Sequence, residues 1–319
     1  MAKPIFILSL PRSGSTLLQR LLLDYGNCAT LGEFSLLLRF LGDGPASTRK
    51  ATYWEFLVDL AKDDMRAQWP GFDDAYYSGV RDLMLRIYSG LSNGKEWFID
   101  KTPRYSLIAD EIIKVFPDAK FIVLWRHPLA IASSMTAQKG YWYPDEFSID
   151  MYEGLARLGA FTEKYKNKIC EIRYEDLIDY PERELERLSL YLEWKDLGKV
   201  LERNLGKAAG GSLGDRTGVK KYKSLSSGSK NSWIESYNNW YRRYWAHRYC
   251  SNWKVSHVMQ RYDYKYPEQL DILPVGFFSG LKDSLLSIKR TVRRHRNPVW
   301  LKRFQKKYRK INGYEVSFR

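Results

Sequence analysis

Short apolar segments alternate with segments of helical periodicity along the N-terminal part of the chain, and this alternation restricts the fold more than any other feature. Four apolar segments have the length of buried β-strands, and a fifth is weaker. Parallel strands need long crossover connections, which the intervening helical patterns supply. The sequence therefore predicts an α/β protein, a three-layer parallel sheet with helices on both faces. The predicted strands are 5–10, 97–100, 121–125 and 169–174, with 28–31 as the weaker one, and the predicted helices are 15–25, 107–116, 131–138, 148–165 and 181–192.

Composition excludes several classes of protein. The 319 residues contain only three cysteines, Cys28, Cys170 and Cys250. This sparse, odd set argues against a disulfide framework or a zinc site and fits a reducing compartment. No segment approaches the about 20 apolar residues that a membrane-spanning helix needs. We therefore expect a cytoplasmic protein without a metal site.

The C-terminal part is predicted to differ from the rest. Residues 233–253 form a predicted aromatic helix, and residues 267–319 a basic amphipathic helical extension to a domain of residues 1–266. Of the net charge of +15, +11 falls in residues 282–319, which contain 13 lysines and arginines but only two acidic residues. Such helices lie on anionic membranes, bind acidic partners or pack on the core. We favour packing on the core and leave a peripheral membrane location open. The apolar stripes are Leu281, Leu285, Ile288 and Val292, then Trp300, Phe304, Tyr308 and Ile311.

The first predicted strand runs directly into the sequence PRSGST and then into a helix. This order places backbone N–H groups at a helix N-terminus, where they bind phosphate or sulfate. Gly14 permits close approach of the backbone, Ser13, Ser15 and Thr16 add hydroxyl donors, and Arg12 adds charge. The GxxxxGK[ST] pattern of a Walker A loop is absent, which disfavours a metal-dependent NTPase. An ordinary turn with a serine N-cap is the alternative.

A second segment, FIVLWRHPLAIASSM, repeats this arrangement. Arg126 follows the strand 121–125, and Ser134 lies eight residues later on the next helix. A guanidinium and a hydroxyl so placed can grip a second phosphate. The alternative is an arginine that ends a strand and an unremarkable helical serine.

PRSGST, followed by Arg126 and Ser134, resembles the two phosphate-binding elements of sulfotransferases that use 3′-phosphoadenosine 5′-phosphosulfate (PAPS). The resemblance spans roughly residues 4–240 and is specific at the motifs. It implies a P-loop NTPase-like sulfotransferase fold, adenosine 3′,5′-bisphosphate (PAP) as product and no metal. It also implies that the first loop holds the 5′-phosphosulfate and the second element the 3′-phosphate. Arg12 matches the branch that includes tyrosylprotein sulfotransferases and many bacterial enzymes.

Sulfuryl transfer to an alcohol needs a base, a cation at the bridging oxygen and donors that align the sulfuryl group. Glu33 follows the weaker strand and is our candidate base, with a solvated surface glutamate as the alternative. Its Gly32-Glu33 context matches the acidic base of the tyrosylprotein-type branch. The resemblance also implies that Lys101, in Lys-Thr-Pro, contacts the bridging oxygen. It further implies that Tyr174 approaches the nucleotide, although core packing competes as its role.

Five candidate residues each come just after a predicted strand: Arg12, Glu33, Lys101, Arg126 and Tyr174. In an open parallel sheet such positions gather at one edge, where ligands bind. The sequence thus predicts one site with separate seats for two oxyanions. In the segment 210–230, rich in Gly, Ser and Lys, the residues Lys220, Lys221 and Lys223 either close over the phosphosulfate or are solvated.

The predicted function is in-line transfer of a sulfuryl group from PAPS to a hydroxyl of a carbohydrate, glycolipid or small molecule. A protein-tyrosine sulfotransferase is the alternative within the family. A nucleotide kinase is disfavoured by the absent Walker lysine. A nucleic-acid-binding protein would spread basic residues over the core, whereas here they gather in the tail, so we expect no nucleic-acid partner.

Overall fold

The computed structural model describes residues 1–42, 53–195, 197–202, 228–272 and 275–295. Within these residues, five parallel strands form one sheet in the order β2-β3-β1-β4-β5. All five predicted strands are confirmed, with ends shifted by at most two residues. The strands are β1 Lys3–Ser9, β2 Cys28–Thr30, β3 Trp97–Lys101, β4 Lys120–Trp125 and β5 Ile169–Arg173.

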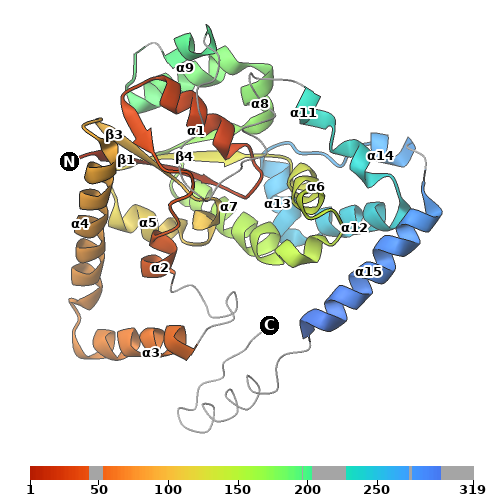
Figure 1. Cartoon of the computed structure of the whole chain (residues 1–319), viewed down its shortest axis with the longest axis horizontal. Coiled ribbons are helices and arrows are strands. Elements are labelled where there is room, and N and C mark those ends of the chain that lie inside the picture. The colour runs from red at the N-terminus through yellow and green to blue at the C-terminus, as the bar shows by residue number, and fades with distance from the viewer. Residues whose placement is uncertain (43–52, 196, 203–227, 273–274, 296–319) are drawn as a thin grey trace.

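The helices connect these strands and cover both faces of the sheet (Figure 1). Those before β5 are α1 Ser15–Asp24, α2 Leu37–Leu41, α3 Tyr53–Gln68, α4 Phe72–Ser92, α5 Ala109–Val115, α6 Pro128–Lys139 and α7 Leu155–Lys164. Those after it are α8 Tyr174–Asp179, α9 Pro181–Leu192, α11 Gly228–Asn231, α12 Trp240–Cys250, α13 Trp253–Arg261, α14 Gln269–Ile272 and α15 Phe277–His295. Shorter turns are the 3₁₀ segments η2 Pro103–Leu107, η3 Pro144–Phe147, η5 Leu197–Glu202 and η6 Ile234–Tyr237 and the π-helical segment η4 Ile149–Gly154.

Two hydrophobic cores lie on opposite faces of the sheet. Successive side chains of a strand point to opposite faces, so Phe6 and Leu8 of β1 enter one core while Ile5 and Ile7 enter the other. Helices α4, α5 and α7 pack on the first face, and α1, α8 and α9 on the second (Figure 1). The predicted three-layer architecture is therefore confirmed.

The sheet has one central strand from which the chain departs in both directions. β1 lies between β3 and β4, and the chain visits β2 and β3 on one side before it crosses to β4 and β5 on the other. All five strands run the same way, so their exit loops leave from one edge. In such sheets the ligand crevice lies at this edge, where the strand order reverses.

The predicted helix over 233–253 is wrong as a single element. The structure divides this stretch into η6, α12 and the start of α13. Asn239 accepts a hydrogen bond from the amide of Arg242 at 3.0 Å, and Asn252 accepts one from that of Lys254 at 3.0 Å. Each asparagine caps a new helix, because its side chain replaces the missing backbone acceptor.

The C-terminal helix α15 packs against α12, and the remaining predicted extension, 296–319, lies outside the described residues. Asp283 of α15 accepts hydrogen bonds from Asn239 at 2.9 Å and from Arg242 at 2.7 Å. The favoured contact with the core is thus present, but the predicted apolar stripe of α15 remains exposed. Among the described helices, none combines the length and the apolar character that spanning a bilayer demands.

Candidate active site

The loop between β1 and α1 turns through two residues with left-handed backbone. Arg12 has a φ of 68° and Gly14 a φ of 91°. The carbonyl oxygen of Gly14 accepts hydrogen bonds from Leu17 and Leu18 at 2.9 and 3.2 Å, so Gly14 is the N-cap of α1. A Cβ atom on Gly14 would lie 2.4 Å from Cδ2 of Tyr174, so only glycine fits there. A non-glycine residue such as Arg12 in this conformation stores about 1–3 kcal/mol of strain, which is characteristic of functional loops.

The hydroxyl of Ser13 is buried and has no hydrogen-bond partner among the described residues. Leaving such a group unsatisfied costs about 1–3 kcal/mol, and the exceptions call for an explanation such as a ligand. The described part of the loop provides no side-chain cap for α1, so the predicted alternative of a serine N-cap is wrong. Ser15 and Thr16 open α1, where backbone N–H groups lack intrahelical acceptors. The loop can therefore bind an oxyanion through hydroxyl and main-chain donors.

Four of the predicted nucleotide-binding side chains meet beside this loop. Arg12 donates from Nε to Oγ of Ser134 at 3.0 Å, which joins the loop to α6. Arg126 donates to the carbonyl oxygen of Arg12 at 2.9 Å, and its guanidinium lies 4.4 Å from the centroid of the Tyr174 ring. Because Tyr174 also covers Gly14, residues from the exits of β1, β4 and β5 form one contiguous cluster. Two guanidiniums in one cluster favour a multiply charged anion.

Glu33 and Lys101 form an ion pair at the exits of β2 and β3. The distance from Lys101 Nζ to Glu33 Oε1 is 3.4 Å, and the side chains are 1% and 29% exposed, respectively. Lys101 pairs with Ile7 of β1 in the sheet. Just beyond the ion pair, the amide of Ser35 donates to Oγ1 of Thr102 at 2.9 Å. A proton acceptor and a buried cation are therefore fixed at the same edge as the anion-binding loop.

Gln19 of α1, which the sequence analysis missed, holds the segment that leads to Glu33. Its Nε2 donates to Oγ1 of Thr30 at 2.7 Å and to the carbonyl oxygens of Leu31 and Gly32 at 3.3 and 3.4 Å. Gln19 is almost fully buried. A polar residue on the apolar face of a helix is the sequence signal that would have revealed it.

Asp100, next to Lys101, has a structural role. Tyr88 and Tyr105 donate hydrogen bonds to its carboxylate at 2.6 and 3.1 Å. Neighbouring residues in a strand point to opposite faces, so Asp100 faces α4 and does not orient Lys101. Burial raises the pKa of Asp100 to about 7, against the hydrogen bonds from the two tyrosines.

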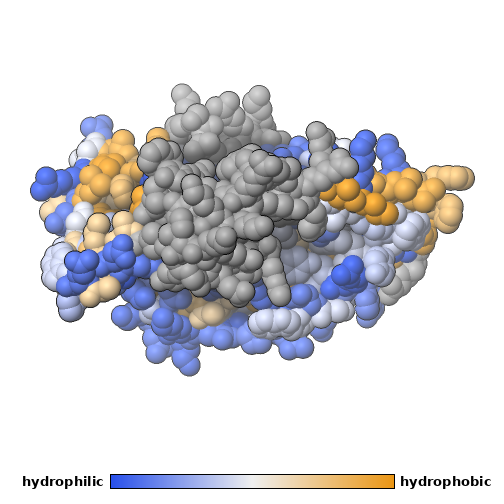
Figure 2. Space-filling model, turned by 90° about the horizontal axis from the view of Figure 1, so that it is seen from below, coloured by the Kyte–Doolittle hydropathy of each residue, from blue (hydrophilic) through white to orange (hydrophobic). Residues whose placement is uncertain are grey.

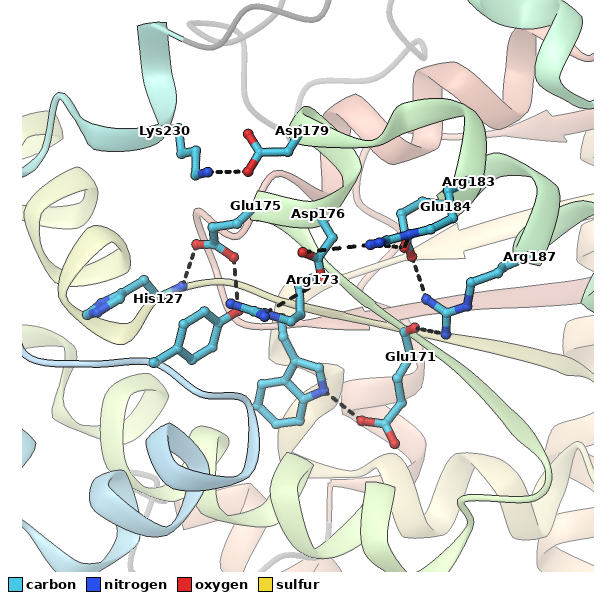
Figure 3. A network of polar contacts seen from close by, with 12 residues as sticks. His127, Glu171, Arg173, Glu175, Asp176, Asp179, Arg183, Glu184, Arg187 and Lys230 are labelled. Carbon is cyan, nitrogen blue, oxygen red and sulfur yellow. Dashed lines mark hydrogen bonds and ion pairs between the residues drawn. The ribbon is translucent and has the colours of Figure 1, made fainter.

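The second motif is locked in place by the network in Figure 3, in which Glu175 reaches His127. The carboxylate of Glu175 accepts hydrogen bonds from the amide of His127 at 2.9 Å and from Tyr264 at 3.0 Å. His127 Nδ1 accepts from the amide of Leu129 at 3.2 Å, and Nε2 lies 2.9 Å from the carbonyl oxygen of Lys265. Burial lowers the pKa of His127 to about 4. His127 therefore caps α6 as a neutral side chain, and Glu175 ties the exits of β4 and β5 together.

The structure brings the predicted residues into two sets at the same edge of the sheet. One contains Arg12, Ser13, Gly14, Ser15, Thr16, Arg126, Ser134 and Tyr174, and the other Glu33 and Lys101. Lys220, Lys221 and Lys223 lie outside the described residues. In the described ranges no three His, Cys, Asp or Glu side chains are grouped as metal ligands.

Comparison with known proteins identifies the class of protein. The profile of the sulfotransferase family matches residues 4–196, which is more than half of the chain. The chain belongs to the sulfotransferase family, as the two motifs predicted. The sulfotransferase domain from the curacin biosynthetic pathway aligns with a TM-score of 0.56 and 20% identity over 84% of this chain and 99% of that chain. The sulfotransferase domain of the Synechococcus PCC 7002 olefin synthase aligns with a TM-score of 0.51 and 20% identity over 83% of this chain and 96% of that chain. Both likenesses confirm the predicted fold.

Among individual relatives, the nodulation protein NoeE of Sinorhizobium fredii is 27% identical over 72% of this chain. The chain spans 59% of the length of NoeE. A putative protein-tyrosine sulfotransferase of Caenorhabditis briggsae is 24% identical over 73% of this chain and 81% of its own length. Protein-tyrosine sulfotransferase 1 of Danio rerio is 26% identical over 66% of this chain and 59% of its own length.

Proposed function

We propose that this protein transfers a sulfuryl group from PAPS to a hydroxyl of a carbohydrate, glycolipid or small molecule by in-line displacement. One observation carries the proposal: the Arg12–Arg126–Ser134–Tyr174 cluster and the Glu33–Lys101 pair occupy the same sheet edge. Family membership fixes the class of chemistry to be expected, and these contacts supply the groups that such chemistry needs.

The residues present fit a bound PAPS molecule. PAPS would supply an activated sulfuryl group and two separate oxyanions. The unsatisfied hydroxyl of Ser13 and the N-terminus of α1 fit the 5′-phosphosulfate. To the 3′-phosphate we assign Arg126 and Ser134, which Arg12 links across the loop. Tyr174, stacked under Arg126, is assigned to the nucleotide.

Glu33 and Lys101 are assigned to the reacting atoms. Glu33 accepts the proton of the acceptor hydroxyl on its carboxylate, which makes the oxygen a better nucleophile. With PAPS bound, the ammonium of Lys101 would stabilise the negative charge that develops on the bridging oxygen as the phosphate leaves. Nζ and Oε1 are 3.4 Å apart, so the base and the cation are close enough to act on the same reacting centre. Burial of Lys101 strengthens this electrostatic effect, because a low dielectric weakens screening.

A protein-tyrosine acceptor is the second candidate. Two relatives bear the name of protein-tyrosine sulfotransferases, and a phenol hydroxyl needs the same base as an alcohol. The acceptor therefore distinguishes the candidates, while the donor and the catalytic pair are shared.

The test is a transfer assay with sulfur-labelled PAPS against panels of glycans, glycolipids, small alcohols and tyrosine peptides. We expect label in a non-protein acceptor without added Mg²⁺. Label confined to tyrosine peptides would replace the first candidate with the second. In a parallel thermal-shift assay, PAP should raise the melting temperature and ATP–Mg²⁺ or an oligonucleotide should not. A response to ATP–Mg²⁺ or to the oligonucleotide alone would contradict the proposal.

A further inference from the structure

Helix α15 is turned the opposite way from an ordinary surface helix. Its buried positions are small or polar: Gly280, Asp283 and Ser287. Asp283 is bound by Asn239 and Arg242 of the α12 region. A helix that merely covers a core would bury its apolar stripe and expose the polar residues. Here the docking contacts are polar, and they leave the apolar side outward.

The outward face is a continuous apolar stripe. At 3.6 residues per turn its members fall within an arc of about 100°. Phe277 and Phe278, at its start, are 67% and 84% exposed. A contiguous patch of large apolar side chains on a soluble surface marks an interaction site. The exposed members are Phe277, Phe278, Leu281, Leu285, Ile288 and Val292.

Several polar contacts fix the orientation of the stripe. Arg290 donates to the hydroxyl of Tyr141 at 3.1 Å, and its guanidinium lies 3.7 Å from that ring centroid. Thr291 is 3.2 Å from the hydroxyl of Tyr143. A Cβ atom on Gly280 would lie 2.3 Å from Nε1 of Trp240, so the two helices approach closely. These contacts run along the helix, and they hold the stripe outward.

Charge identifies what the stripe fits. Lys282 and Lys289 are exposed and lie along one border of the stripe, next to Leu281 and Ile288 in sequence. Residues 282–319 carry 13 basic and two acidic side chains. An apolar stripe bordered by lysines is the pattern of a helix that lies in the headgroup layer of an anionic membrane.

The same face of the molecule carries a second apolar area. Figure 2 views the molecule from the side on which α3 and α15 project in Figure 1, and hydrophobic atoms gather at both ends of this face, over α15 and over the α3–α4 end. Val58 and Met65 of α3 and Trp69 beyond it are exposed.

We propose that α15 is a membrane-docking helix that places its apolar stripe in the headgroup layer of anionic lipid bilayers. The polar contacts with α12 then fix α15 relative to the rest of the protein, so that the protein binds the lipid surface in one orientation. This inference is independent of the reaction that the protein catalyses.

The experiment is vesicle flotation of the full chain with phosphatidylcholine alone and with phosphatidylcholine mixed with phosphatidylglycerol. The wild type should float with the mixed vesicles, less so at high salt. A Phe278→Ser, Leu285→Ser double variant should lose about tenfold or more in partitioning. The matched control is Leu190→Ser on α9, where Leu190 is 76% exposed outside the stripe; it should float as the wild type does.

A second pair of variants keeps the test decisive if the first folds poorly. Lys282→Glu with Lys289→Glu should lower binding to mixed vesicles by more than about tenfold, since each lysine near an anionic surface contributes about fivefold. Circular dichroism checks that the variants are folded. Wild-type protein that floats with neither vesicle, or stripe variants that float like the wild type, would overturn the proposal. So would light scattering that shows a wild-type dimer and a monomeric Phe278→Ser, Leu285→Ser variant.

Discussion

Tyr174 lies where the two proposed anion-binding elements meet. Its ring covers Gly14 of the first loop and stacks under Arg126 of the second motif. The sequence left nucleotide contact and core packing open for this residue, and in the structure it packs against both elements at once. The Tyr174 ring therefore has two contacts to satisfy: close packing against Gly14 and a cation–π contact with Arg126.

Replacing Glu33 with glutamine tests the assignment of the base. The amide keeps the shape but cannot accept the acceptor proton, so kcat should fall by about 10²–10⁴ while PAP affinity stays unchanged. Steady-state kinetics and calorimetric titration measure the two quantities. The control is Glu96→Gln, a change at the opposite edge of the sheet, where Glu96 pairs with exposed Lys3. Normal turnover by the Glu33→Gln enzyme would remove the assignment.

Arg126→Ala tests the proposed binding site for the 3′-phosphate. A charge-assisted hydrogen bond contributes about 1.5–3 kcal/mol, so PAP affinity should fall by roughly 10–150-fold. Adenosine 5′-monophosphate lacks the 3′-phosphate, so its affinity should change much less. Calorimetric titration of both ligands gives the ratio. The control is Arg81→Ala on α4, where Arg81 pairs with Asp118. An equal loss for both ligands would place Arg126 elsewhere in the site.

At the scale of elements, side-chain contacts from neighbouring elements hold several strand exits in place. Gln19 of α1 holds residues 30–32, and Glu175 ties β5 to β4. Apolar periodicity predicts the strands and the helices of the sheet layer, because those elements are defined by burial. It does not predict which polar groups pair across them, as Gln19 and Glu175 do, because such pairs arise only from tertiary packing.

A change at Gln19 tests the support of Glu33. In Gln19→Glu the side chain keeps its size but loses its N–H donors, so the carbonyls of Leu31 and Gly32 lose a partner. Unfolding free energy should fall by about 1–3 kcal/mol, and kcat should fall while the affinity for PAP is retained. Urea denaturation, kinetics and PAP titration separate these effects. A fully active Gln19→Glu enzyme would show that the contacts do not position Glu33.

Errors in the prediction also occur at the scale of elements. The stretch 233–253 reads as one helix from its aromatic spacing, yet two asparagine caps divide it. The long helices α3 and α4 were not assigned. Helix α4 buries a regular stripe that includes Phe72, Val80, Met84 and Tyr88, so the signal for this helix was present in the sequence.

At the scale of the whole molecule, the parallel sheet brings all strand exits to one edge, and this topology is why residues that follow the strands could be expected to gather there. Five residues that follow strands were expected to converge: Arg12, Arg126 and Tyr174 form one cluster and Glu33 and Lys101 an ion pair, both at this edge. The division of the chain at residue 266 remains a prediction.

The pH dependence of global stability should report on Asp100. Its folded pKa of about 7 exceeds the value of about 3.9 for an unfolded aspartate. Between these values the folded molecule holds a proton that the unfolded chain has released, so this group lowers the free energy of unfolding as pH rises from about 4 to about 7. Asp100→Asn should flatten that fall.

Urea denaturation of both proteins at about pH 5 and pH 8 checks this. His127, whose lowered pKa of about 4 acts in the opposite direction, is common to both and cancels in the comparison. An identical pH dependence in the two proteins would show that Asp100 titrates normally.

The most direct measurement is calorimetric titration of PAP, without Mg²⁺, into the wild type and an Arg12→Ala, Arg126→Ala double variant. If PAP binds at the edge of the sheet where the strands end, one mole should bind per mole of wild type. The affinity of the variant should be at least about 10²-fold weaker, since two charge-assisted contacts are lost. Equal affinity in both proteins, or no binding to the wild type, would contradict the site.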